Sequence, residues 1–103
     1  MIKISVLYPY KAGAAFNMDY YVTRHMPMVR DTIGAACKGI AVEQGLSGTG
    51  PGTQPTYVAM GHVLIDSLAA FQTAFAEHGA KFMADIPNYT TIEPIIQVSE
   101  VKL

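Results

Sequence analysis

Two of the three histidines in this chain lie on apolar helical stripes. Read at helical spacing, residues 17–33 place His25 in the middle of one stripe (Met18, Tyr21, Val22, His25, Val29, Thr32, Ile33). His78 takes a similar place in a second stripe, where the steps are three and four (Leu68, Phe71, Phe75, His78, Phe82). A neutral imidazole suits a general acid or base near pH 7. The pattern makes His25 and His78 candidate catalytic residues, with a hydrogen-bonded core histidine as the alternative for each.

Both stripes are expected to face a sheet, so the two imidazoles are predicted to line one cleft between helices and sheet. Small-molecule pockets combine apolar walls with a few polar groups. Aromatic residues and the third histidine supply both, and the predicted substrate-binding residues are Tyr8, Tyr21, His62, Phe75, Phe82 and Tyr89. Asp85 and Glu77 are the carboxylates nearest to His78 in sequence. Either can orient an imidazole, and a solvated surface role is the alternative.

Other kinds of chemistry fit the sequence less well. The three histidines lack the Glu-x-x-His and Cys-x-x-Cys spacings of metal sites, so no metal and no cofactor are expected. Cys37 is interpreted as a structural thiol. The glycines at 48, 50 and 52 lack the strand–turn–helix context of a phosphate loop, and Pro51 interrupts them. No Gly-x-Ser-x-Gly nucleophile motif occurs.

The elements that must position these residues follow the order βαββαβ. Strands are predicted at 2–8, 38–46, 57–65 and 91–103, with Pro94 favouring an edge position for the last. The first helix is predicted at 17–33, capped by Asn17, ended by Gly34 and interrupted by Pro27 just after His25. The second helix is predicted to begin at Asp66 or Ser67 and to stop at Gly79, with a short turn around Phe82.

This order predicts an α+β, ferredoxin-like fold, in which two helices cover one face of a four-stranded antiparallel sheet. The segment 57–65 is apolar on both sides: Val58, Met60 and Leu64 alternate with residues such as Val63 and Ile65. Such a strand does not leave its second face to water. The sequence therefore predicts a homodimer through the open sheet face.

Composition limits the classes of function. With 103 residues, half of them apolar and 15% charged, the chain is expected to form one globular domain over residues 1–103. A net charge of −1 and the lack of a basic patch argue against nucleic acid and anionic membranes as partners. No segment reaches membrane-spanning length. The single cysteine, Cys37, allows no internal disulfide, and a cytoplasmic location is expected.

Several segments together resemble the EthD-like family, which is named for ethyl tert-butyl ether degradation. They are Ser5-Val6-Leu7-Tyr8-Pro9, Phe16-Asn17-Met18-Asp19-Tyr20-Tyr21, His25-Met26-Pro27-Met28-Val29, Glu77-His78-Gly79 and Asp85-Ile86-Pro87-Asn88-Tyr89-Thr90. The resemblance spans nearly the whole chain. It implies a dimeric α+β barrel, in a superfamily that includes muconolactone isomerases, polyketide cyclases and cofactor-free monooxygenases.

The resemblance implies roles for particular residues. In one isomerase branch a histidine matching His25 acts with a tyrosine of the second strand, where this chain has Ile40 and Val42. In the plant cyclase branch a histidine placed like His78 acts as the base. A second histidine of that branch, on the third strand, corresponds to a position near Ala59 in this chain. Three hypotheses follow: a cofactor-free enzyme acting on a small hydrophobic oxygenated compound, a non-catalytic carrier of such a compound in a catabolic pathway, and a structural dimer.

Overall fold

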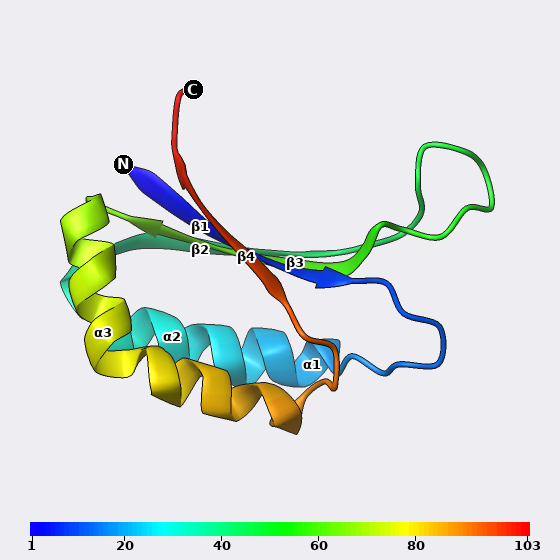
Figure 1. Cartoon of the computed structure of the whole chain (residues 1–103), viewed down its shortest axis with the longest axis horizontal. Coiled ribbons are helices and arrows are strands. Elements are labelled where there is room, and N and C mark those ends of the chain that lie inside the picture. The colour runs from blue at the N-terminus through cyan, green and yellow to red at the C-terminus, as the bar shows by residue number, and fades with distance from the viewer.

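Four strands form one antiparallel sheet in the computed structural model, which describes residues 1–103 (Figure 1). They are β1 (Ile2–Pro9), β2 (Cys37–Gln44), β3 (Tyr57–Ile65) and β4 (Ile95–Glu100), in the spatial order β2-β3-β1-β4. This confirms the predicted ferredoxin-like fold. The predicted bounds of the second and fourth strands are too long: Leu46 lies beyond β2 and is fully exposed, and β4 begins only after Pro94.

The first helix follows the predicted range in three consecutive parts, α1 (Met18–Tyr20), the π-helical turn η1 (Tyr21–His25) and α2 (Met26–Ile33). The Asn17 side chain caps it by accepting a hydrogen bond from the Tyr20 N–H. Gly34 ends it with a φ of 75°, a left-handed conformation that glycine adopts without steric cost, and the 3₁₀ turn η2 (Gly34–Ala36) leads into β2.

The interruption predicted at Pro27 is present as the π-helical turn. Proline has no N–H to donate to the Thr23 carbonyl, and its ring crowds that carbonyl in a regular α-helix. The chain widens here instead, and the Met26 N–H donates to the Tyr21 carbonyl five residues earlier. Tyr21 and His25, at the two ends of this turn, are both buried and their rings stack with an interplanar angle of 13°.

The second helix, α3 (Leu68–Asp85), is longer than predicted and passes through Gly79 before the 3₁₀ turn η3 (Ile86–Asn88). Ser67 caps it by accepting from the Ala70 N–H. Gly79 does not end the helix. It is buried inside α3, where a Cβ would lie 3.0 Å from the ring of Phe75, one turn earlier. Phe82 therefore belongs to α3 and not to a separate turn.

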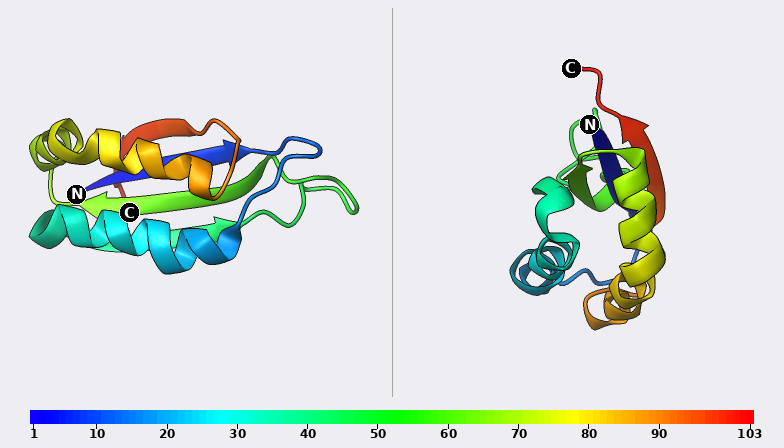
Figure 2. Two further views of the ribbon diagram at one scale, coloured as in Figure 1. Left: turned by 90° about the horizontal axis from the view of Figure 1, so that it is seen from below. Right: turned by 90° about the vertical axis from the view of Figure 1, so that its left-hand side faces the viewer.

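Both helices cover the same face of the sheet, as two views at right angles show (Figure 2). The covered face carries the buried side chains of the central strands, Ile2, Ile4, Tyr8, Ala59, Val63 and Ile65. The opposite face carries the alternate residues of β3, which are partly exposed: Val58, Met60, His62 and Leu64. Edge strand β4 exposes Ile95, Ile96 and Val98. None of the helices combines the length and hydropathy that crossing a bilayer requires.

Candidate functional site

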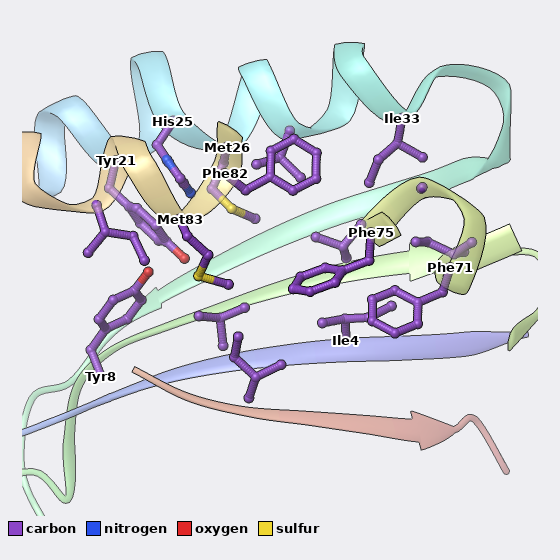
Figure 3. A pocket seen from close by; sticks show the side chains of 17 residues that line it. Ile4, Tyr8, Tyr21, His25, Met26, Ile33, Phe71, Phe75, Phe82 and Met83 are labelled. Atoms are coloured by element: carbon purple, nitrogen blue, oxygen red, sulfur yellow. The ribbon is translucent and has the colours of Figure 1, made fainter. Parts of the chain in front are cut away.

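A cavity of about 70 Å³ lies between the two helices and the sheet (Figure 3). Seventeen residues line it, and His25 is the only one that is not hydrophobic. The most exposed of them are Phe75 and Met83 on α3 and Ile96 on β4, so the cavity opens between α3 and the edge strand. The rest of the wall is formed by Ile4, Val6, Tyr8, Tyr21, Met26, Val29, Ile33, Val63, Ile65, Phe71, Ala74, Phe82 and Ile86.

The structure brings five of the eight predicted site residues to this cavity, His25, Tyr8, Tyr21, Phe75 and Phe82. Tyr89 lies directly behind the wall. His62 and His78 lie elsewhere. The expected cleft between helices and sheet is therefore present, but it contains one imidazole and not two.

His25 reaches the cavity from the π-helical turn and is held by a carboxylate from the end of α3. Its Nδ1 lies 2.8 Å from Oδ2 of Asp85. The same carboxylate accepts hydrogen bonds from the Tyr20 hydroxyl at 2.8 Å and from the Asn88 side-chain amide at 2.9 Å. Because Nδ1 is occupied in this way, the free ring nitrogen, Nε2, is the one available to a molecule in the cavity.

Burial and hydrogen bonding set the charge of this pair. Burial lowers the pKa of His25 below its ordinary value of 6.5, although the hydrogen bond and charge of Asp85 raise it part of the way back. Burial raises the pKa of Asp85, but the hydrogen bonds from Asn88, His25 and Tyr20 outweigh this and leave it below 3.8. At neutral pH, Asp85 is therefore ionised and His25 is neutral. The Nδ1–H donates to Asp85, and Nε2 carries the lone pair of a general base.

Three tyrosines form the polar end of the site. The hydroxyls of Tyr8 and Tyr89 are 2.6 Å apart and hydrogen-bonded. The Tyr89 ring packs on His25 at a centroid distance of 4.7 Å, and Tyr21 stacks on His25 from the same helix. Burial is the largest cause that raises the pKa of each of the three tyrosines, so all three remain protonated.

The Tyr21 hydroxyl has no hydrogen-bond partner, although it is buried. It packs on Gly61 of β3, where a Cβ would overlap the hydroxyl oxygen. Gly61 is therefore the residue that makes room for this hydroxyl. Figure 3 shows the hydroxyls of Tyr8 and Tyr21 pointing toward one another at one end of the cavity.

His78 lies outside the cavity, so the expectation that it shares a cleft with His25 is wrong. Its imidazole lines a shallow surface hollow beside Ile33 and Thr73, and its Nε2 is 3.4 Å from Glu77. At this turn of α3 the buried residue is Gly79, and the side chain of His78, one position earlier, is partly exposed. Of the two carboxylates near His78 in sequence, Glu77 contacts it, whereas Asp85 is bonded to His25.

His62 lies on the open face of the sheet, away from the cavity. Its Nδ1 is 3.0 Å from the Ser5 hydroxyl and its Nε2 is 2.7 Å from Glu43. A Ser-His-Glu chain of this kind is found in hydrolases. Here, however, Ser5 lies on a central strand that pairs with β3 and β4, so the local backbone N–H groups face the sheet ladder rather than an oxyanion. No group of three or more His, Cys, Asp or Glu side chains is arranged to hold a metal ion.

Asp85 was considered only as an orienting carboxylate for His78, and Tyr20 was not among the predicted site residues. Tyr20 falls on the polar side of the helical stripe in the sequence, and Asp85 lies 60 residues from His25. A pairing over that distance depends on how the two helices pack, which no local pattern reports. The one available signal was the position of Asp85 in the segment 85–90, which the family resemblance had already singled out.

The fold and the site define a class: ferredoxin-like α+β proteins with an apolar helix–sheet cavity that contains a histidine–carboxylate pair. The EthD domain model matches residues 13–93, and the chain therefore belongs to the EthD family. No curated protein matches the chain.

Among the solved structures similar to this chain are two EthD-like proteins. An EthD-like protein from Ralstonia eutropha JMP134 is 47% identical, with a TM-score of 0.95 over 99% of this chain and 92% of that one. An EthD family protein from Bacillus halodurans C-125 is 16% identical, with a TM-score of 0.67 over 99% of both chains, and shows a likeness of fold alone.

Proposed function

We propose that this protein binds a small hydrophobic oxygenated compound in the helix–sheet cavity and performs cofactor-free acid–base chemistry on it. The supporting observation is the His25–Asp85 pair, which leaves a neutral Nε2 on an otherwise apolar wall. The cavity of about 70 Å³ is small, so it limits the ligand to a small molecule. In the proposed step, Nε2 removes a proton from a carbon next to a carbonyl group, and the electrons of the C–H bond form an enolate. Isomerisation and cyclisation use this step.

The proposal assigns the base to His25. His78 is not given this role, since its imidazole does not reach the cavity wall. The proposal also places the protein in the cytoplasm, as a homodimer joined through the open sheet face. There the partly exposed apolar side chains of β3 surround His62.

A matched pair of substitutions on α3 tests binding. Ala74 lines the cavity, whereas Ala76 is exposed on the same helix. Acetophenone serves as a neutral one-ring probe, measured by calorimetry. Ala74→Leu should abolish binding by filling the cavity, and Ala76→Leu should bind as the wild type does. Equal binding by both variants would show that the probe occupies another site.

Proton exchange separates an enzyme from a carrier. A general base in contact with bound acetophenone exchanges the methyl protons of the ketone with deuterium from D₂O, which NMR detects. The wild type and His78→Gln should accelerate this exchange, and His25→Gln should not. Binding without acceleration in the wild type would favour the alternative function, a non-catalytic carrier. Absence of any ligand binding would favour a structural dimer.

A further inference from the structure

The Tyr21 hydroxyl is the one buried side-chain polar atom of the protein without a hydrogen-bond partner. Tyr21 is completely buried. The Tyr8 hydroxyl is close enough to influence the pKa of Tyr21, but the two hydroxyls do not have hydrogen-bond geometry, and the Tyr8 hydroxyl is bonded to Tyr89 at 2.6 Å. Buried hydroxyls are nearly always paired, because an unpaired donor loses its bond to water and gains nothing in return. An unpaired donor in the wall of a cavity therefore points to a partner that enters the cavity.

The state of the hydroxyl fixes the direction of that hydrogen bond. Burial raises the pKa of Tyr21, so the phenol keeps its proton at every physiological pH. A protonated phenol in an apolar wall offers an O–H donor, and the matching group on a ligand is an oxygen that accepts. The position above Gly61 holds the hydroxyl in place, since the oxygen occupies the space that a side chain at this position would take.

The rest of the wall limits the charge of the ligand. No lysine or arginine is among the 17 lining residues, and 16 of them are hydrophobic. The nearest carboxylate, Asp85, is held behind the His25 ring by three hydrogen bonds. A carboxylate or phosphate in this cavity would be desolvated without a cation to pair with and close to a negative charge. The cavity therefore excludes anions.

We propose that the Tyr21 hydroxyl donates a hydrogen bond to the oxygen of the ligand, and that the ligand is an uncharged, mainly apolar molecule with a ketone-like or aldehyde-like carbonyl. This inference rests on the proposed function and names the class of compound that the same cavity takes. Tyr21 then binds the oxygen from the same wall of the cavity that carries His25, because the two rings stack at a centroid distance of 5.5 Å.

Three probes of similar shape test the inference. Acetophenone has the carbonyl oxygen, α-methylstyrene replaces that oxygen by a methylene group, and benzoate adds a negative charge. Binding is measured by calorimetry to the wild type, to Tyr21→Phe and to Tyr10→Phe, which removes the hydroxyl of a tyrosine that is not in the cavity wall. Tyr21→Phe should weaken acetophenone binding by about 5-fold to 10-fold, the value of one hydrogen bond, and leave α-methylstyrene unchanged.

In the same experiment Tyr10→Phe should change neither affinity, and benzoate should not bind to the wild type. Equal effects of Tyr21→Phe on acetophenone and α-methylstyrene, or no effect on either, would overturn the inference. Tight binding of benzoate would overturn the neutral class of ligand. Circular dichroism and thermal unfolding of Tyr21→Phe establish that the variant folds.

A measurement on the wild type alone keeps the inference open to refutation if Tyr21→Phe does not fold. The infrared carbonyl stretch of bound ¹³C-labelled acetophenone should lie below its frequency in hexane, because a hydrogen bond weakens the C=O bond. A frequency equal to that in hexane would overturn the inference while leaving the cavity as a binding site. If acetophenone binds equally well to Ala74→Leu, or does not bind at all, the proposed function fails and this inference fails with it.

Discussion

Nδ1 of His25 and Oδ2 of Asp85 lie 2.8 Å apart, and the residues are 60 positions apart in the chain. The contact joins the π-helical turn of the first helix to the C-terminal end of α3. It also fixes the tautomer of the imidazole, because an ionised carboxylate accepts only from an N–H. The lone pair is therefore on Nε2, and the imidazole presents a base to the cavity instead of a hydrogen-bond donor.

The substitution Asp85→Asn should lower the pKa of His25 further. Asp85 raises this pKa through its hydrogen bond and its charge, and the burial that lowers it would remain. The titration of the His25 ring protons by NMR measures the effect. The matched control is Glu77→Gln, which removes the carboxylate beside His78 and should leave the His25 titration unchanged. A pKa of His25 that is equal or higher in Asp85→Asn would refute the assignment.

The low pKa of His25 should make the protein less stable in mild acid. Between pH 6.5 and the lower pKa of the folded protein, the His25 imidazole is protonated in the unfolded chain but neutral in the folded protein. The unfolded state then binds more protons, and stability falls as pH drops from 6.5 through the folded pKa. Each pKa unit of difference corresponds to about 1.4 kcal/mol.

Urea unfolding from about pH 8 to about pH 5 measures this dependence. His25→Gln carries no titrating imidazole at this position and should show a flatter profile. His78→Gln, in which a partly exposed histidine is replaced, should follow the wild type. Parallel profiles for the wild type and His25→Gln would contradict the burial-lowered pKa.

Gly61→Ala should destabilise the protein by about 1–3 kcal/mol, the usual range for overpacking. The new methyl group would overlap the Tyr21 hydroxyl. Gly39→Ala is the control, because its Cβ would meet only the Leu64 side chain at 3.5 Å, an ordinary contact. Combining Gly61→Ala with Tyr21→Phe should recover part of the loss, as measured by urea unfolding, because the overlap with the oxygen is gone while the ring carbon Cζ still lies 3.0 Å from the new methyl group. Additive effects of the two substitutions would mean that the hydroxyl does not occupy that space.

Tyr8→Phe should cost about 1–2 kcal/mol of stability, because it leaves the buried Tyr89 hydroxyl without its partner. In the double variant Tyr8→Phe/Tyr89→Phe both hydroxyls are gone, and the loss should be smaller than the sum of the single losses by about 1 kcal/mol. Tyr10→Phe, at an exposed tyrosine, should change stability by less than about 0.5 kcal/mol. Strict additivity would contradict the pairing of Tyr8 with Tyr89.

The proposed dimer should dissociate when a charge is placed on the open sheet face. Met60→Lys suits this test because Met60 pairs with Glu43 on β2, so that the monomer can accommodate the new charge. Sedimentation should show the dissociation constant of the dimer rising at least about 100-fold, because burying the lysine charge in the interface costs desolvation free energy. Gln72→Lys, on the exposed side of α3, should have no effect. A wild type that is monomeric at micromolar concentration would refute the dimer.

The periodic features of the sequence predicted most of the fold. The apolar run at 57–65 matches β3 at both ends, and Asn17 and Gly34 mark the ends of the first helix by their local chemistry. The second helix was predicted too short because glycine is a common end signal. Gly79 instead lies inside α3, where a Cβ would crowd the ring of Phe75 one turn earlier, and the helix continues through it to Asp85.

The site was only partly predictable for the same reason. A helical stripe shows that His25 points inward, and the structure places it in the cavity wall. The stripe of the second helix included His78, but a helical stripe is wide, and one residue along the helix separates the buried Gly79 from the partly exposed imidazole. The partner of His25 and the free hydroxyl of Tyr21 depend on how elements pack across the core, which residue spacing does not encode.

The π-helical turn also bears on how the length of the first helix can vary. A π turn contains one residue more than an α turn, so deleting a residue from the interior of Tyr21–His25 and also replacing Pro27, which a regular α-helix does not accommodate, would convert it to regular α-helix. The helical segments before and after the turn, α1 and α2, would still present the same sides to the sheet. Tyr21 and His25 would then be three positions apart instead of four, a spacing that still leaves both on one side. This turn is therefore a place where the first helix can lose a residue, together with Pro27, while Tyr21 and His25 stay on the same side of it.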